Sequence, residues 1–187
     1  DEHFKQLFGL FDFSETFLES FLNGLLELDG TCDSIKGIEI LPREMFVFSD
    51  IQAKCRGDLI ARSEDKLFLI EMQNKYDEDF MPRFRLYSSL LISHQATAGK
   101  SKNYSKALKE VNAIAIFKDT PNDSWTYDSD KIKKEQNEVL SKDKVFQHVF
   151  SLKGFKKENA GRDFNYASTL RDQWLDLLAN SQNMRAI

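Results

Sequence analysis

Two acidic residues and a glutamine have types and a spacing that favour metal chemistry. Asp58 is followed by twelve intervening residues and then by Glu71 and Gln73. Residues 53–75 contain two strand-like runs that flank a polar turn at residues 63–66, which predicts a β-hairpin. In a hairpin closed by two or four turn residues, the numbers of opposed residues sum to 129, so Asp58 would face Glu71. Opposed side chains have Cβ atoms roughly 4.5–5.5 Å apart, and Gln73 would come next along the same face.

Two neighbouring carboxylates repel each other, and a divalent cation would relieve that repulsion. Mg²⁺ prefers oxygen ligands, typically takes one or two carboxylates, and keeps waters that a phosphate can displace. Such an ion can polarise a phosphodiester, activate a water and stabilise charge on the leaving oxygen. The pair therefore indicates phosphodiester hydrolysis.

An ordinary surface hairpin explains the same alternation, with both carboxylates solvated. Two details point the other way. Ile60, Leu67 and Leu69 would share the face of the carboxylates, so one end of that face should be covered. Glu71 also lies within an apolar run, where its carboxylate would be partly desolvated. The residues alone leave a site and a solvated surface both open.

The rest of the sequence predicts the elements that would position this hairpin. Helices are expected over residues 1–9, 14–29, 80–98 and 166–178. The second would follow an N-cap at Ser14 and end at Asp29-Gly30, and the third has Pro82 in its first turn and Gly99 at its close. Strands are expected over residues 35–41, 45–48, 111–117 and 145–152. Residues 118–143 read as an irregular polar stretch.

Length and composition bound the class of protein. The 187 residues suit one domain, and 16 Phe supply much of its core volume. No apolar run is long enough to span a bilayer, the start shows no signal-peptide pattern, and Cys32 and Cys55 have neither zinc nor disulfide spacing, so we expect a cytoplasmic protein. The net charge of −4 counts against a dedicated DNA-binding protein. A nuclease can still be acidic overall and bind DNA through a local basic strip.

The chain resembles a known family in an ordered set of motifs. Asp58 with Glu71 and Gln73 resembles the Asp…Glu-x-Lys signature of the PD-(D/E)XK nucleases, with Gln in the place of Lys. More narrowly, the chain is similar to the PD-(D/E)XK nuclease family transposases, also called the recombination-promoting nuclease (Rpn) group. The matching pieces are DEHFKQLFG, FLNGLLEL, IKGIEIL, LFLIEMQ, Phe80-x-x-Arg83 with Tyr87, Gly99 with Tyr104, NEVLSKDKVFQHVFSLKGF and LRDQWLDLL.

This resemblance implies a restriction-endonuclease-like α/β fold, a mixed β-sheet flanked by α-helices. It implies a single domain over residues 1–187, with a core at about 14–117 and a C-terminal strand and helix at about 145–183. It also implies a bacterial DNA endonuclease that depends on Mg²⁺ or Mn²⁺. By that analogy Asp58, Glu71 and the backbone carbonyl of Met72 would bind the metal, and Gln73 would orient the attacking water or contact the phosphate.

Two positions depart from the signature. Gly57 stands where the signature has Pro, a replacement that is common in the superfamily, and Gln73 removes a positive charge that could stabilise the transition state. Lys54, on the same strand face as Asp58, either supplies that charge or is a surface lysine. An alternative function follows: a nucleic-acid-binding or regulatory domain that keeps the fold and cleaves weakly or not at all. A protein-interaction module with an acidic surface is a third reading.

Several further residues are accessory candidates, each weighed against a plain surface role. Glu27 and Glu39 could supply an extra acid, and Arg83 with Tyr87 could contact a phosphate or the acidic centre. The candidates for DNA-backbone contact are the lysines of one strip: Lys100, Lys102, Lys106 and Lys109. A double-strand break generally needs two active sites, which would be consistent with a homodimer.

Overall fold

The structure, a computed structural model, describes six stretches of the chain: residues 14–42, 57–97, 107–121, 126–128, 143–163 and 168–180. Their strands form one mixed sheet in the order β1-β2-β3-β4-β6-β5. The strands are β1 (Glu39–Leu41), β2 (Leu59–Arg62), β3 (Lys66–Lys75), β4 (Glu110–Asp119), β5 (Thr126–Asp128) and β6 (Val145–Ser151). The helices in the described residues are α2 (Ser14–Leu25), α3 (Phe80–Thr97), α6 (Leu152–Glu158) and α7 (Leu170–Asn180).

Strand directions divide the sheet into an antiparallel and a parallel part. The first three strands pair antiparallel, β3 pairs parallel with β4, β4 pairs parallel with β6, and β5 returns antiparallel along β6. Helix α3 connects β3 to β4, as a crossover between parallel strands requires. The expectation of an α/β fold with a mixed sheet flanked by helices is confirmed.

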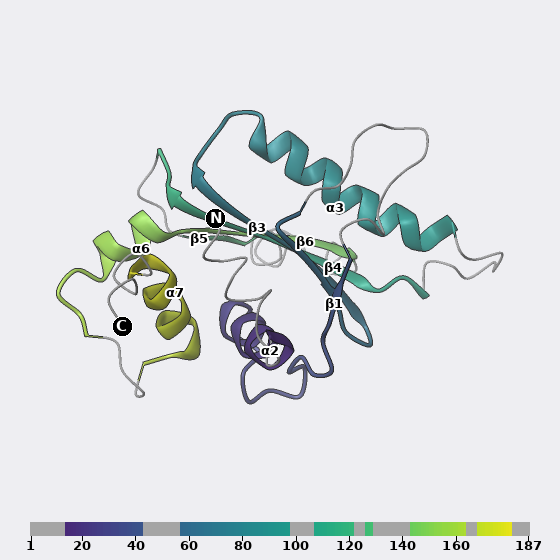
Figure 1. Ribbon diagram of the computed structural model, residues 1–187, viewed down its shortest axis with the longest axis horizontal. Helices are drawn as coiled ribbons and strands as arrows, with labels where there is room; N and C mark the ends of the chain where they lie inside the picture. The colour runs from purple at the N-terminus through teal and green to yellow at the C-terminus, as the bar shows by residue number, and fades with distance from the viewer. Residues whose placement is uncertain are drawn as a thin grey trace.

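Helices cover both faces of the sheet, and each face has its own apolar core (Figure 1). On one face α3 packs alone among the described helices, through Phe80, Phe84 and Leu91. On the other face α2, α6 and α7 pack against alternate residues of β2, β3 and β4. Strand β4 is buried on both faces, which explains its almost unbroken apolar sequence. No helix in these stretches is long and apolar enough to cross a membrane.

Helix α2 ends earlier than its sequence predicts. Asp29-Gly30 was the expected stop, but the helix finishes at Leu25 and Glu27 takes a left-handed conformation with φ 56°. The N–H of Leu28 donates to the Asn23 carbonyl at 2.8 Å, and the N–H of Glu27 donates to the Gly24 carbonyl at 3.1 Å. This is a Schellman motif with Glu27 at the position that glycine usually occupies. The prediction that the helix would end at Asp29-Gly30 was therefore wrong.

Other predicted elements are confirmed with shifted bounds. The helix at Phe80–Thr97, the buried strand β4 and the strand β6 all lie where periodicity placed them. The strand expected over residues 35–41 shortens to β1, because Ile35 bonds its N–H and carbonyl to the Asn23 side chain, at 2.7 and 3.0 Å, instead of to a strand. The expected helix at 1–9 and strand at 45–48, with Gly99 and Tyr104, lie outside the described residues.

The C-terminal part differs most from expectation. Strand β5 lies inside the stretch expected to be irregular, and α6 follows β6 directly, where the sequence predicted strand up to residue 152 and no helix before residue 166. Ser151 caps α6, because its hydroxyl accepts the N–H of Gly154 at 3.1 Å. Helix α7 begins at Leu170, after Thr169 accepts the N–H of Asp172 at 3.1 Å, and not at residue 166.

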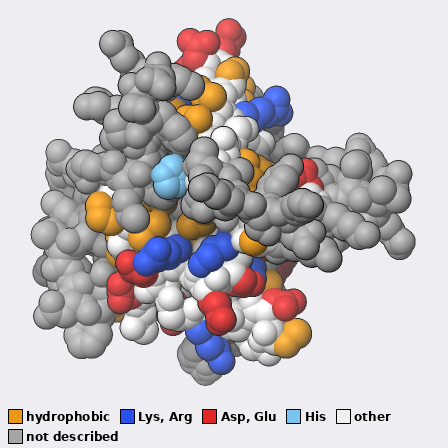
Figure 2. All heavy atoms as spheres, turned by 90° about the vertical axis from the view of Figure 1, so that its right-hand side faces the viewer, with side chains coloured by type: hydrophobic (Ala, Val, Ile, Leu, Met, Phe, Trp, Pro, Cys, Tyr) orange, Lys and Arg blue, Asp and Glu red, His pale blue; other side chains and the backbone are white. Residues whose placement is uncertain are grey.

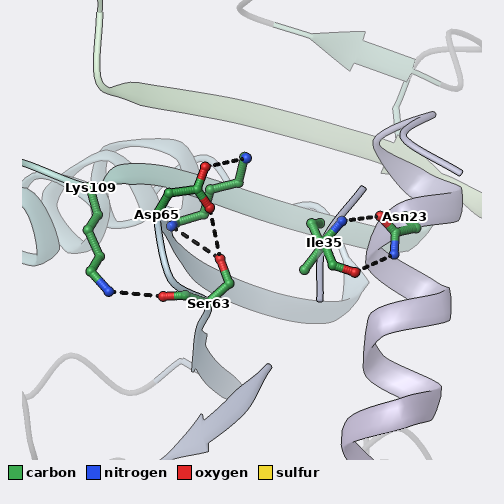
Figure 3. A network of polar contacts seen from close by, with 6 residues as sticks. Asn23, Ile35, Ser63, Asp65 and Lys109 are labelled. Atoms are coloured by element: carbon green, nitrogen blue, oxygen red, sulfur yellow. Dashed lines mark hydrogen bonds and ion pairs between the residues drawn. The ribbon is translucent and has the colours of Figure 1, made fainter. Parts of the chain in front are cut away.

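The hairpin turn between β2 and β3 is tied to the rest of the sheet by a polar network (Figure 3). Ser63 donates its hydroxyl to Asp65 at 3.2 Å and accepts the N–H of Lys66 at 3.2 Å. From the residue before β4, the Lys109 ammonium donates to the Ser63 carbonyl at 2.9 Å. Lys109 is therefore part of the hairpin's support, although the sequence placed it in a strip for DNA contact.

Candidate metal and active site

The register of the hairpin is the one that the sequence predicts. Leu59 pairs with Ile70 and Arg62 with Leu67, so the residue numbers of each pair sum to 129. The ladder nevertheless ends at Leu59, and Asp58 lies in a bend just before it. The sequence predicted that Asp58 would pair with Glu71 in the ladder, but the ladder does not reach Asp58. Instead, the Asp58 side chain contacts the edge of β3.

The Asp58 carboxylate takes the place of a strand partner for Met72. Its Oδ2 accepts the backbone N–H of Met72 at 2.8 Å. That amide belongs to the peptide bond between Glu71 and Met72, so the first carboxylate rests against the backbone that carries the second. A charge-assisted bond of this kind holds a carboxylate more firmly than a contact with water does.

The backbone carbonyl of Met72 points toward the same edge. The Ser63 N–H donates to the Lys66 carbonyl at 2.9 Å, which shows that the backbone groups of Lys66 face β2. Every second residue of a strand faces the same neighbour, so Met72 faces this edge too, in agreement with its N–H bond to Asp58. The N–H and C=O of one strand residue point the same way, which places the Met72 carbonyl on the side where Asp58 lies.

Glu71 projects onto the face that α3 covers. Its neighbours on that face are Leu69 and Ile60, both fully buried in the core beneath α3, and Glu71 itself is only 6 % exposed. Gln73, half-buried and on the same face, donates its side-chain N–H to Glu71 Oε2 at 3.4 Å. The apolar end of this face is covered, as the sequence indicated, and the carboxylate of Glu71 is the point where that core becomes polar.

The structure explains why residue 57 is a glycine, which the sequence did not reveal. A Cβ built on Gly57 would lie 2.4 Å from Cδ1 of Leu69 and 3.4 Å from Cγ1 of Ile60. Both of those side chains belong to the α3 face, whereas regular alternation would place residue 57 on the opposite face. The chain therefore turns at Asp58, and this turn, which lacks room for a side chain at Gly57, delivers the carboxylate to Met72.

The two accessory acids do not join this pair. Glu39 lies on β1 and bonds Arg62 at 2.8 Å, four residues along β2 from Asp58, a distance of about 13 Å at the usual strand rise. Glu27, at the end of α2, pairs with Arg171 of α7 at 3.0 Å. Both are exposed residues of other parts of the surface.

Arg83 and Tyr87 lie on α3, the helix above Glu71. Tyr87 packs against the core beneath α3. Arg83 is exposed; its guanidinium lies 5.7 Å from the Phe80 ring centroid and 3.8 Å from the Asp77 carboxylate. Lys54, Lys100, Lys102 and Lys106 lie outside the described residues.

The described part of the chain contains no cluster of three or more His, Cys, Asp and Glu side chains that could hold a metal ion. At the hairpin, the groups that could hold a metal ion are the Asp58 and Glu71 carboxylates and the Met72 carbonyl, hard oxygen donors of the kind that suits Mg²⁺ or Mn²⁺.

Carboxyl pKa values are displaced elsewhere in the fold. The hydrogen bond from Lys66 lowers the pKa of Asp65 in the hairpin turn. The hydrogen bond from Lys153, at 2.8 Å, lowers the pKa of Asp119 at the end of β4. Both carboxylates are exposed, and both pairs lie at ends of strands of the sheet.

Comparison with known proteins identifies the family. The family model of the PD-(D/E)XK nuclease family transposases matches residues 1–186 of the chain. No curated protein and no solved structure gave a significant match. The match covers almost the whole chain and includes the hairpin with Asp58 and Glu71. The chain therefore belongs to the PD-(D/E)XK nuclease family transposases.

Proposed function

We propose that this protein is a metal-dependent DNA endonuclease whose centre is formed by Asp58, Glu71 and Gln73. One observation carries the proposal: the Asp58 carboxylate is bonded to the Glu71–Met72 peptide, next to a second carboxylate that is buried. Two carboxylates held at neighbouring positions are the hard oxygen ligands that a divalent cation prefers. Membership of a nuclease family supports phosphodiester hydrolysis as the reaction.

The residues fit a divalent cation. Asp58, Glu71 and the Met72 carbonyl offer oxygen ligands from the two adjacent arms of the hairpin. A bound Mg²⁺ or Mn²⁺ would polarise the scissile phosphate and lower the pKa of a bound water. The chain's own contribution is to fix the ligands: the Met72 N–H holds the Asp58 carboxylate, and the Gln73 amide holds the Glu71 carboxylate.

Gln73 has a limited chemical role. Its side-chain N–H donates to Glu71, which leaves its carbonyl oxygen to accept a hydrogen bond from an attacking water. An amide does not titrate near neutral pH, so Gln73 can orient that water but cannot remove its proton. The proton must pass to solvent or to the substrate phosphate. We expect slower cleavage than a lysine at this position would give.

The test is cleavage of supercoiled plasmid by the wild type and by Asp58→Ala, in Mg²⁺, Mn²⁺ or EDTA. We expect nicking that needs metal and disappears in the variant, because the first ligand is lost. The control is Glu39→Ala, which removes an exposed acid of β1 and should leave nicking unchanged. Nicking that persists in Asp58→Ala would reject this centre.

A second candidate is a DNA-binding domain that has lost efficient cleavage, and Gln73 is the observation that favours it. Gln73→Lys distinguishes the two. If the missing cation limits the reaction, this variant should nick plasmid at least about tenfold faster than the wild type. No nicking by either protein, together with DNA binding by both, would favour the second candidate.

DNA as the substrate, the cytoplasm as the setting and a homodimer for double-strand cleavage belong to the same proposal. They rest on the family and on the chemistry of the acidic pair.

A further inference from the structure

Charge is divided unevenly along this chain. Residues 80–109 contain none of its 30 acidic residues but six of its 26 lysines and arginines, so this segment carries a charge of +6 and the remainder −10. A protein with an overall charge of −4 therefore has one continuous cationic segment. Segregation of this kind favours a polyanionic partner at that segment.

Helix α3 and residues 107–109 are the described parts of this segment, and α3 has side chains exposed to solvent from residue 82 to residue 94. It packs on the sheet through one side only, and α2, α6 and α7 all lie on the opposite face of the sheet (Figure 1). Its exposed residues are Pro82, Arg83, Arg85, Leu86, Ser89, Ser93 and His94. Leu86 is the only large apolar side chain exposed on the described part of α3, so this surface is polar and cationic.

Arg85 is the central cation of this surface. It is exposed, and within the described parts of the chain its guanidinium forms no ion pair. Arg83, two residues earlier, is partly compensated by Asp77 at 3.8 Å. A guanidinium suits phosphate, because its planar set of N–H donors can bond two oxygens together.

The C-terminal end of α3 is fixed to the sheet. The Gln95 side chain accepts the Lys109 N–H at 2.7 Å and donates to the Lys109 carbonyl at 3.3 Å. Seen from the side of Figure 1 on which α3 ends, acidic and basic side chains are mixed over the surface (Figure 2). Helix α3 itself contains Arg83 and Arg85 and no acidic residue, whereas the exposed acidic residues 77–79 lie directly before its first turn.

We propose that the solvent-facing side of α3 binds the sugar–phosphate backbone of duplex DNA, with Arg85 as its main contact. This inference rests on the proposed function, since it names where the substrate lies. Helix α3 covers the sheet face that carries Glu71, so a duplex along α3 would lie on the same side of the sheet as this carboxylate. The cations of α3 offset the repulsion between the acidic pair and the phosphates.

The test compares two charge reversals that change the net charge equally. Arg85→Glu alters α3, whereas Lys156→Glu alters α6 on the opposite face, at an exposed lysine without an ion pair among the described residues. Binding of a fluorescent duplex is followed by anisotropy in EDTA over a range of salt, so cleavage is not required. We expect Arg85→Glu to weaken binding about tenfold or more and to reduce the salt dependence by about one phosphate contact. Lys156→Glu should bind as the wild type does.

Equal effects of the two substitutions, or no binding of duplex by the wild type, would overturn the proposal. An acidic peptide such as polyglutamate serves as a second ligand, and selective loss of that ligand alone in Arg85→Glu would overturn it in favour of a protein partner. Circular dichroism confirms folding, and Arg85→Gln, a milder change, should give a smaller loss of DNA affinity.

The outcome is separable from that of the proposed function. Plasmid nicking by the wild type with equal DNA affinity in both variants rejects the α3 surface and leaves the nuclease. Affinity lost only in Arg85→Glu, with no nicking in any metal, supports the α3 surface and rejects the nuclease.

Discussion

Gly57→Ala should destabilise the protein at the bend that delivers Asp58. The new Cβ would lie 2.4 Å from Cδ1 of Leu69, whereas ordinary contacts begin at 3.4 Å, so the two carbons overlap by about 1 Å. Leu69 is fully buried beneath α3 and cannot turn away without displacing its neighbours. Overpacking a buried site of this kind costs about 1–3 kcal/mol.

The free energy of unfolding measures this cost, by urea titration of the wild type, Gly57→Ala, Leu69→Ala and the double variant. Leu69→Ala alone removes a buried side chain and costs about 2–5 kcal/mol. It also removes the atom that the new Cβ would meet. The double variant should therefore lose about 1–3 kcal/mol less free energy of unfolding than the two single variants lose together.

Leu91→Ala provides the matched control, because Leu91 is fully buried in the same core and is not one of the residues that face Gly57. Its effect should add to that of Gly57→Ala. A neutral Gly57→Ala, or equal coupling to both leucines, would refute the argument that this bend needs glycine.

Two further substitutions test local conclusions. Glu27→Gly should raise the free energy of unfolding by up to about 1 kcal/mol, because glycine adopts the left-handed conformation without strain and the Glu27 side chain of the lost ion pair is exposed; thermal or urea unfolding measures this, and a loss of stability would contradict it. Asp65→Asn should lower the free energy of unfolding at pH 7 by at most about 1 kcal/mol, because the folded protein lowers the pKa of this exposed carboxyl. That contribution is complete above the ordinary value of 3.8 and disappears as the pH falls through the lower folded pKa, so the wild type and the variant should converge in acid; a difference that grows in acid would contradict the assignment.

The hairpin was predictable because one short turn fixes its register. Once residues 63–66 are taken as the turn, the alternation of a strand assigns every side chain of the hairpin to one face or the other. The observed pairs, from Leu59–Ile70 to Arg62–Leu67, follow this assignment. The long helix α3 and the buried strand β4 were predictable for the same reason, since each has a period or an apolar run long enough to identify.

The bend at Asp58 could not be predicted from alternation. It depends on the contact between the backbone at Gly57 and Leu69, and on a side chain replacing a ladder bond at Met72. The resemblance to the nuclease family did suggest Gly57 as a replaced proline, but did not indicate that a side chain there would collide.

Short elements were missed for a different reason. Strand β5 has three residues and α6 has seven, so neither shows a period, and each depends on β6 and the core beside it. Likewise, Glu39 and Glu27 could be separated from the acidic centre only after the structure showed their partners, Arg62 and Arg171.

The most direct test of the central claim is a Mn²⁺ titration of the purified protein, by calorimetry or by the electron paramagnetic resonance of the free ion. The wild type should bind Mn²⁺, Asp58→Asn and Glu71→Gln should each lose that binding, and Glu39→Gln should retain it. Equal binding by all four proteins, or none by the wild type, would contradict a metal centre at Asp58 and Glu71.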